Sequence, residues 1–160
     1  MSDFEAIRDW LKTCPTISEL FSIFADGQDG ANLITPFSSS ERAVINDGFD
    51  VTGAYEAEVN PLSSVYEEYQ VDCFRRAYPN DDSYNILAYD DVKEICRWIE
   101  AQNELRNFPD IGENIVRVEP KPFLPQVRFK DIETGLAGYF FTLRITYVNK
   151  MKEATIRYDY

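Results

Sequence analysis

The chain has 160 residues, a formal net charge of −12, 44% hydrophobic and 14% aromatic residues, and no histidine. A chain of this length and apolar content is expected to fold as one domain with a substantial core. The lack of histidine excludes Ser-His-Asp and Cys-His nucleophile systems, and the acidic balance disfavours binding to nucleic-acid phosphates or acidic membranes.

The N-terminus and the cysteines indicate a protein that is made and folded in a cytoplasm. Residues 1–5 are acidic and lack the basic and apolar regions of a signal peptide. No apolar stretch approaches the roughly 20 residues that span a bilayer. Cys14, Cys73 and Cys96 are odd in number and widely spaced, a pattern typical of reduced, partly buried thiols and not of a disulfide or metal framework.

The charge is unevenly distributed along the chain. Residues 1–114 hold 23 acidic and 8 basic side chains, a net of −15, whereas residues 115–160 hold 5 acidic and 8 basic, a net of +3. Solubility alone can account for such a balance. The alternative is a negative face that keeps DNA from sticking or that meets a basic partner.

The first predicted element is a helix over residues 3–13. Ser2 can act as its N-cap, and the acidic Asp3 and Glu5 lie at the positive end of the helix dipole. Pro15 ends it. The apolar stripe, with Trp10 beside it, consists of Phe4, Ile7 and Leu11.

The next predicted elements are short. The apolar residues 17–24 fit either a helix or a strand, and residues 26–30 form a turn. Residues 31–37 are predicted to be a strand, which Pro36 places near a sheet edge.

A long polar loop over residues 38–64 follows, interrupted by a short strand at 43–45. Loops of this length are usually functional or disordered. Residues 66–78 then read as a long strand with two mixed faces, so neither face is predicted to be a fully buried one. The two faces comprise Tyr69, Val71, Cys73, Arg75 and Ala77 on one side and Gln70, Asp72, Phe74, Arg76 and Tyr78 on the other.

The main helix is predicted to begin between Asn85 and Asp90 and to run to about Asn107. Pro109 and Gly112 are expected to end it. Its apolar stripe follows helical spacing and consists of Val92, Ile95, Cys96 and Ile99, with Trp98 beside it.

The last third of the chain is predicted to be β-structure. Strands at residues 115–119 and 126–132 flank a proline-rich segment, and a sharply alternating strand covers 139–148. A final alternating segment contains Ala154, Ile156, Tyr158 and Tyr160. The predicted fold class is therefore α+β: one domain in which a mainly antiparallel sheet is packed by one or two helices.

No catalytic, cofactor-binding or metal site is predicted. Residues 26–30 begin like an EF-hand loop, but Ala31 stands where that loop needs glycine and Phe37 where it needs glutamate. The acid pairs at 81–82 and 90–91 fit helix caps better than cation ligands. The chain has no glycine-rich phosphate loop, and one arginine pair is too small for a nucleic-acid surface.

Five segments together carry a resemblance. They are residues 7–11 (IRDWL), 69–77 (YQVDCFRRA), 98–103 (WIEAQN), 108–111 (FPDI) and the aromatic strand 139–147. In order and spacing they resemble the tail terminator proteins of long-tailed bacteriophages, especially those of Gram-positive hosts, which are also labelled minor capsid or tail completion proteins. The likeness covers most of the chain. The long loop at about 38–64 and the C-terminal extension at about 151–160 depart from it.

The resemblance implies a structural virion protein and not an enzyme, with one tail-terminator-like domain over residues 1–160. Such proteins form a hexameric homo-oligomeric ring that caps the tail tube, ends its polymerisation and offers a docking surface for the head completion or connector proteins at the neck. DNA passes through the lumen without specific binding. Six chains of −12 each would carry −72 in all, which suits such a conduit. No cofactor and no membrane are involved, and the protein is made in the bacterial host cytoplasm.

Two sets of residues are predicted to serve this assembly. Aromatic content beyond what one core needs, together with strand edges that must be covered, predicts subunit contacts at Phe129, Tyr139, Phe141, Tyr147, Ile156, Tyr158 and Tyr160. Acids on a rigid strand can present like charge to passing phosphates, which predicts a lumenal role for Glu67, Glu68 and Asp72. Further lumenal candidates in the loop are Asp47, Asp50, Glu56 and Glu58.

An acidic inhibitor that mimics DNA and blocks a nucleic-acid enzyme is the alternative function. The charge and the small size favour it, whereas the aromatic and weakly basic C-terminal third argues against it. An enzyme ranks third. Light scattering separates a ring of six chains from a monomer or dimer.

Overall fold

The two described helices lie on one face of a mixed sheet. The computed structural model describes residues 2–36, 43–45 and 64–148. The elements are α1 (Asp3–Leu11), β1 (Phe21–Ser22), β2 (Asn32–Pro36), β3 (Ala43–Ile45), β4 (Ser64–Arg76), α3 (Asp82–Leu105), β5 (Ile115–Asp131) and β6 (Leu136–Val148). The α+β class predicted from the sequence is confirmed.

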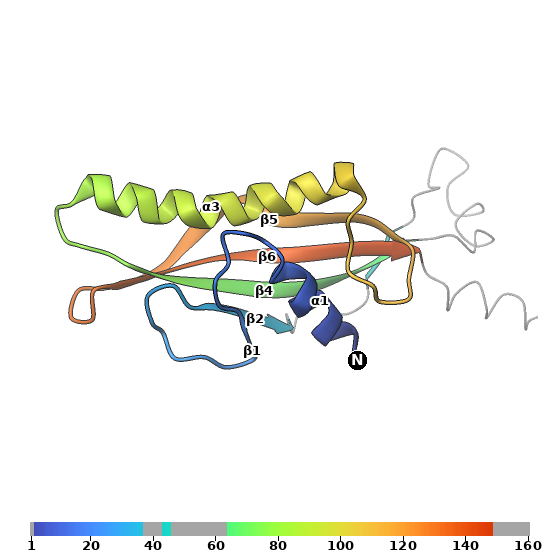
Figure 1. Ribbon diagram of the computed structural model, residues 1–160, viewed down its shortest axis with the longest axis horizontal. Helices are drawn as coiled ribbons and strands as arrows, with labels where there is room; N and C mark the ends of the chain where they lie inside the picture. Colours follow the sequence, from blue (N-terminus) through green and yellow to red (C-terminus); the bar gives the residue numbers. More distant parts are fainter. Residues whose placement is uncertain (1, 37–42, 46–63, 149–160) are drawn as a thin grey trace, which may run out of the picture.

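The strand order across the sheet is β1-β2-β4-β6-β5, with β3 paired to the start of β4 (Figure 1). Only β1 and β2 run parallel; the other pairs are antiparallel. β4 and β6 pair over their full length, from Ser64 opposite Val148 to Arg76 opposite Leu136. These two long strands therefore form the centre of the sheet.

Helix α1 begins as the sequence predicts and ends two residues earlier. The Ser2 hydroxyl accepts a hydrogen bond from the Glu5 amide at 3.1 Å, and the Glu5 carboxylate accepts one from the Ser2 amide, which makes a capping box. At the other end, the Trp10 indole Nε1 donates to the Asn107 carbonyl oxygen at 2.9 Å. The ring of Trp10 also packs on that of Trp98, with centroids 5.1 Å apart. These two contacts hold α1 against the C-terminal part of α3.

Helix α3 is longer at its start than predicted. The side chain of Asp81 caps it by accepting a hydrogen bond from the Tyr84 amide at 3.1 Å. The first turns carry the exposed Ile86 and Leu87, so they lack the buried stripe by which the sequence locates a helix. The helix ends at Leu105, and the C-cap Arg106, with a left-handed φ of 54°, turns the chain before Pro109 is reached.

The prediction that neither face of the long strand would be fully buried is wrong. One face of β4 lies in the core, with Val71 and Cys73 fully buried under the helices. Arg75 lies on the same face and is also buried, because its guanidinium is paired with the Asp91 carboxylate at 2.8 Å and with Asn32 Oδ1 at 3.1 Å. A charge that is neutralised in this way can occupy a core position.

Two other predicted elements differ from the structure. The segments at 115–119 and 126–132 belong to one strand, β5, whose register with β6 shifts between Lys121 and Gln126, where the prolines lie. The undecided segment 17–24 forms only the two-residue β1, and a γ-turn centred on Ile23 follows, with φ of 73° and a 2.9 Å hydrogen bond from the Phe24 amide to the Ser22 carbonyl.

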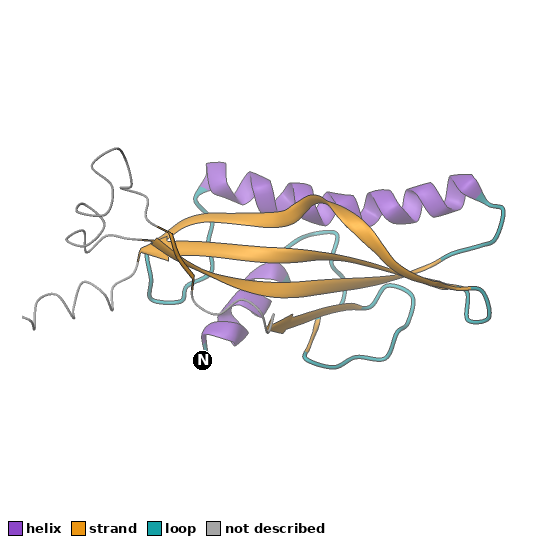
Figure 2. Ribbon diagram, turned by 180° about the vertical axis from the view of Figure 1, so that it is seen from behind, coloured by secondary structure: helices purple, strands orange, loops and turns teal. Residues whose placement is uncertain are grey.

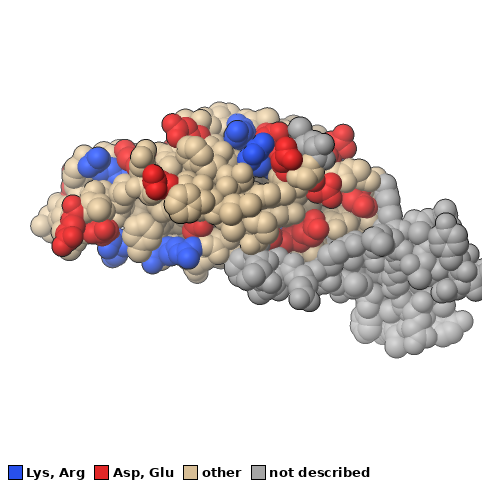
Figure 3. Space-filling view, turned by 90° about the horizontal axis from the view of Figure 1, so that it is seen from below, with Lys and Arg blue, Asp and Glu red and all other residues tan. Residues whose placement is uncertain are grey.

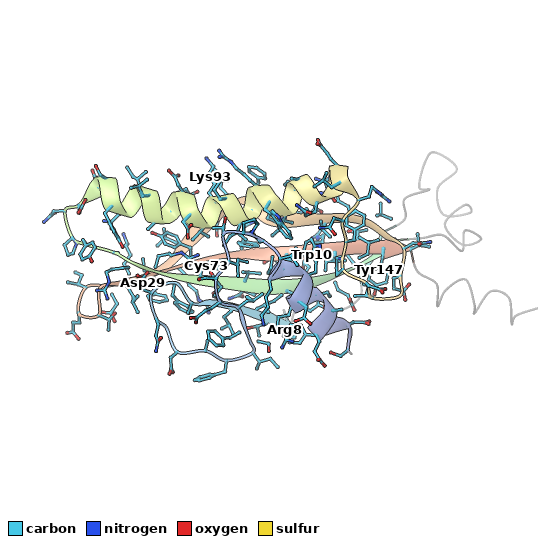
Figure 4. The ribbon with its side chains drawn as sticks, viewed as in Figure 1. Arg8, Trp10, Asp29, Cys73, Lys93 and Tyr147 are labelled. Carbon is cyan, nitrogen blue, oxygen red and sulfur yellow. The ribbon has the colours of Figure 1, made fainter. Side chains whose placement is uncertain are left out.

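The core lies between the helices and one sheet face. In Figure 4, Trp10, Cys73 and Tyr147 lie in this layer, whereas Lys93 lies on the side of α3 that faces away from the sheet. The strand predicted at 43–45 is present as β3. The rest of the predicted loop and the extension at 151–160 lie outside the described residues. None of the described helices has the length and apolar character needed to cross a membrane.

Candidate interaction surface

The sheet face opposite the helices is covered by no described helix (Figure 2). Side chains alternate along β4 and β6, so the face turned away from the core collects every second residue of each strand. We call this surface the open face. Its central members are Tyr66, Glu68, Gln70, Asp72 and Phe74 from β4 and Phe140, Thr142 and Arg144 from β6.

Near the start of β4, a cross-strand ion pair neutralises the open face. Glu68 and Arg144 are direct partners in the β4–β6 register. Arg144 Nε donates to Glu68 Oε2 at 3.0 Å, and both side chains are largely enclosed. The guanidinium also lies over the Tyr66 ring, 4.0 Å from its centroid, an arrangement that favours a fixed cation.

A second ion pair lies further along the open face. Arg128 Nη1 of β5 donates to Asp72 Oδ1 at 2.9 Å, and the amide of Gln70 donates to the same carboxylate at 3.1 Å. The Asp72 side chain is only 10% exposed, whereas that of Arg128 is half exposed. The carboxylate is therefore held by two donors and presents little free negative charge.

An aromatic cluster occupies the end of the open face towards the β5–β6 turn. Phe129 pairs across the strands with Gly138. A Cβ at Gly138 would lie 2.7 Å from Cδ1 of Phe129, so the ring lies directly on the glycine backbone. Phe129 also packs on Phe74 with ring centroids 6.0 Å apart. Glycine at 138 is thus what allows the ring to lie flat across the sheet.

The structure separates the three acids that were predicted to line a lumen. Glu68 and Asp72 share the open face, but each is paired with an arginine. Glu67 is on the opposite face of β4, where its carboxylate accepts a hydrogen bond from the Tyr69 hydroxyl at 3.5 Å. The prediction of one wall of free acids on this strand is corrected, because neighbouring strand residues point to opposite faces. The loop candidates Asp47, Asp50, Glu56 and Glu58 lie outside the described residues.

The structure places the residues predicted as subunit contacts in different surroundings. Tyr139, Phe141 and Tyr147 are at most 5% exposed and belong to the core beneath the helices. Side chains that are buried within the subunit offer almost no surface to another chain, so these three positions are core residues in the structure. Phe129 remains 39% exposed on the open face. The other three candidates, Ile156, Tyr158 and Tyr160, lie outside the described residues.

Several titratable groups of the described chain have pKa values shifted by burial. Burial raises the pKa of the Cys73 thiol from 9.0 to about 12 and also raises the pKa values of Cys96 and Cys14. Burial also raises the pKa of the Tyr69 hydroxyl. Thiols held in their protonated form are poor nucleophiles. Within residues 2–36, 43–45 and 64–148, no group of three or more His, Cys, Asp or Glu side chains could hold a metal ion.

Sequence reasoning missed the two arginine pairs of the open face. Arg144 and Arg128 lie 76 and 56 residues from their carboxylate partners, and the sequence does not show that these strands are neighbours. The alternation of the strands was the available signal, since it places Glu68 and Asp72 on one face and Glu67 on the other. In Figure 3, lysine and arginine are interspersed with acids over the side seen from below.

Comparisons with known proteins find no match: no protein-family model matches the chain, and no curated protein matches it in sequence.

Proposed function

We propose that this chain is a structural protein of a bacteriophage or phage-tail-like particle, which forms a ring that caps the tail tube. The ring ends tube polymerisation and provides the docking surface for the proteins that join head and tail. The five sequence segments that resemble tail terminator proteins support the proposal. The structure adds features that suit assembly.

The arrangement of the sheet is the observation that carries the proposal. Both described helices cover one face, so no described helix covers the open face, and the long strand β5 forms one edge of the sheet. A closed ring needs two different complementary patches on each subunit. The open face bears the exposed Phe129, and β5 carries further exposed apolar side chains at Phe123, Leu124 and Val127. Exposed apolar groups on a sheet edge favour association with another chain.

The charges of the open face suit a conduit whose wall does not bind DNA, but their arrangement differs from the one predicted from the sequence. The Arg144–Glu68 and Arg128–Asp72 pairs leave the open face nearly neutral, so a lumen lined by it would neither attract nor strongly repel phosphates. DNA binds a protein chiefly when free cations displace its counterions. Arginines engaged with carboxylates provide little of that attraction. We therefore propose a wall of paired charges in place of the wall of free acids.

The first test is the assembly and its place in the particle. We expect light scattering and electron microscopy of the protein, alone or with tail tube protein, to show closed rings of about six copies, the number that the resemblance implies. Antibody labelling of particles should mark only the head-proximal end of the tail. Labelling at every layer of the tube, or a single copy in each tail, would contradict the proposal.

A DNA-mimic inhibitor remains the alternative outcome of that test. It would appear as a monomer or dimer that binds a nucleic-acid enzyme and leaves tails of normal length when it is deleted. The two arginine–carboxylate pairs on the open face do not favour it, because a mimic needs unpaired acids over one surface.

A further inference from the structure

The loop after β1 holds two adjacent large apolar side chains in solvent. Phe24 is 76% exposed and Ile23 is 64% exposed. The backbone at Ile23 has a φ of 73°, a conformation that is sterically unfavourable for a β-branched residue. Such strained positions persist only where the surrounding structure enforces them, and they cluster at functional sites. We call Ile23 and Phe24 the knob.

Hydrogen bonds anchor the loop on both sides of the knob. The Ile23 amide donates to the Ile34 carbonyl oxygen of β2 at 3.0 Å. Further along the loop, the Asp29 carboxylate accepts a hydrogen bond from the Arg76 amide of β4 at 2.8 Å. A group that is already held in place loses little conformational freedom when it binds a partner. The knob is therefore prepared for contact with another surface.

A small apolar hollow lies at one end of the molecule. The β5–β6 turn and the start of α3 are found at this end (Figure 1), and the hollow has a volume of about 190 Å³. Its walls include Ala77, Tyr78 and Pro79 after β4, and Ile132 and Leu136 on either side of the β5–β6 turn. An apolar cavity of about 150 Å³ can hold a benzene ring. The hollow therefore has room for one phenyl group.

The walls of the hollow are fixed within the subunit. The Asn85 side chain accepts a hydrogen bond from the Tyr78 amide at 2.9 Å and donates one to the Tyr78 carbonyl oxygen at 2.7 Å. The Ala77 amide donates to the Gly135 carbonyl oxygen at 2.8 Å, which joins the connection after β4 to the β5–β6 turn. At the rim, Ile132 is 81% exposed, so an occupant of the hollow would also remove this apolar side chain from water.

We propose that the knob of one copy inserts into the hollow of a second copy, with the Phe24 ring filling it. The ring does not fill the hollow of its own chain, because Phe24 is largely exposed within the subunit. Knob and hollow are two different patches, and a contact between different patches is the kind that builds a ring. The inference rests on the proposed ring assembly and specifies one of its contacts.

Charged groups beside the two patches favour the same pairing. Asp26 is exposed two residues after Phe24, and Lys130 is exposed and lines the hollow. Among the ion pairs of the described residues, none involves Asp26 or Lys130. Asp131 also lines the hollow, but its carboxylate already accepts hydrogen bonds from two backbone amides of its own turn. A carboxylate that accompanies the ring can pair with the Lys130 ammonium, and such pairs at a rim fix orientation more than they add affinity.

The contact is small compared with the interface of a stable dimer. An aromatic side chain buries roughly 150–250 Å², whereas a stable specific interface buries about 1,200–2,000 Å² in total. We therefore expect the knob and hollow to associate weakly between isolated chains. The contact becomes stable in a closed ring, where every subunit is held by two neighbours at once.

Disulfide trapping in the full-length chain detects a weak contact and keeps the Phe24 ring in place. Single variants Asp26→Cys and Lys130→Cys are prepared, both at exposed positions. The native thiols are buried, so they should not compete under mild oxidation. We expect the two variants, when mixed, to form a disulfide-linked heterodimer. Its yield should be at least tenfold above that of Asp26→Cys mixed with the control Lys121→Cys, an exposed lysine on the same strand, β5.

The ring itself is tested by adding Phe24→Asp to the Asp26→Cys chain, which should reduce the yield at least tenfold. A yield that does not depend on the Phe24 ring would overturn the proposal. Equal yields with Lys130→Cys and Lys121→Cys would overturn it as well. So would a disulfide within one chain of the Asp26→Cys/Lys130→Cys double variant at high dilution, because the loop would then reach its own hollow.

Complementation tests whether the contact joins two different patches. Phe24→Asp removes the knob and Ile132→Asp places a charge at the rim of the hollow, both at exposed positions, and circular dichroism should show both variants folded. Each is expected to weaken self-association at least tenfold in sedimentation, whereas a mixture should form heterodimers through the one intact knob and the one intact hollow. The control Leu105→Asp, at a position that is 70% exposed at the other end of α3, should assemble like the wild type.

Ring formation separates failure of this contact from failure of the proposed function. If Phe24→Asp forms rings as readily as the wild type, the knob contact is wrong and the ring proposal stands. If the wild-type chain forms no ring alone or with tail tube protein but the disulfide still forms, the contact stands and the proposed function fails.

Discussion

At the residue scale, one buried arginine joins three elements of the fold. The Arg75 guanidinium contacts Asp91 of α3 at 2.8 Å and Asn32 of β2 at 3.1 Å. The Asn32 amide in turn donates to the Glu19 carbonyl at 2.8 Å. A buried cation is tolerated only when it is paired and hydrogen-bonded, so these partners explain how an arginine can lie on the core face of β4.

The contact between Gly138 and Phe129 leads to a prediction at the same scale. A methyl group at residue 138 would meet the Phe129 ring, and the ring could escape only by leaving Phe74. We expect Gly138→Ala to lower the free energy of unfolding by about 1–3 kcal/mol in denaturant titrations. In the Phe129→Ala background the same substitution should cost much less, because the clash is gone.

The control for this cycle is Thr142→Ala, on the same strand and the same face. This substitution adds no atom near the Phe129 ring, and it is expected to change the free energy of unfolding by less than about 1 kcal/mol. Equal costs of Gly138→Ala with and without the Phe129 ring would show that the ring does not explain the need for glycine.

At the scale of elements, the side chain of Asn103 connects α3 to the edge of the sheet. Asn103 satisfies both backbone groups of Val118, and the Trp10 indole contacts the chain just after α3, at Asn107. The C-terminal part of α3 is therefore held to both β5 and α1. The first turns of α3 have exposed apolar residues, Ile86 and Leu87, and contribute little to the core.

We predict that Asn103→Ala loosens the first half of β5. Two hydrogen bonds are lost, and the amide and carbonyl of Val118 are left without their partner, which should cost about 1–3 kcal/mol. Hydrogen exchange should show the amide of Val118 opening faster, with a smaller change in the centre of β4. Glu104→Ala, at the adjacent exposed position, is the control; faster exchange at Val118 in both variants would count against a specific role of Asn103.

At the scale of the whole molecule, a strongly acidic chain encloses a core that contains three thiols. Cys14, Cys73 and Cys96 all lie between the helices and the sheet and are buried. Their pKa values are raised chiefly because burial disfavours the thiolate. The free energy of unfolding of the domain is therefore expected to depend on pH in the alkaline range.

We predict that the free energy of unfolding falls as the pH rises above about 9. The folded chain keeps the proton of Cys73 up to a pKa of about 12, whereas the unfolded chain releases it at its ordinary pKa of 9.0. The unfolded state then binds fewer protons, so stability drops by up to about 1.4 kcal/mol per pH unit for each such group. Denaturant titrations between pH 7 and pH 11 measure this slope.

Cys73→Ala should make that slope shallower, although it also lowers stability at neutral pH by leaving a small cavity. The change in slope, and not the offset, is the diagnostic quantity. Cys96, Cys14 and Tyr69 shift in the same direction, so part of the decline should remain. An unchanged slope in the variant would mean that Cys73 does not contribute to the alkaline instability.

The sequence by itself determined the features that depend on near neighbours in the chain. The N-cap of α1 at Ser2, the buried stripe of α3 and the alternation along β6 all depend on residues close together in the sequence. The α+β class followed from these elements and is confirmed. The first turns of α3 were missed because they bury no stripe, and β5 was divided into two strands because its prolines resemble breaks.

Only the tertiary structure decided which strands are neighbours and what each face meets. It packed one face of β6 beneath the helices, so Tyr139, Phe141 and Tyr147 are core residues. It also paired Glu68 and Asp72 with arginines 76 and 56 residues away. Such pairings depend on the tertiary fold of the whole chain, because local periodicity carries no information about partners that are this far apart in the sequence.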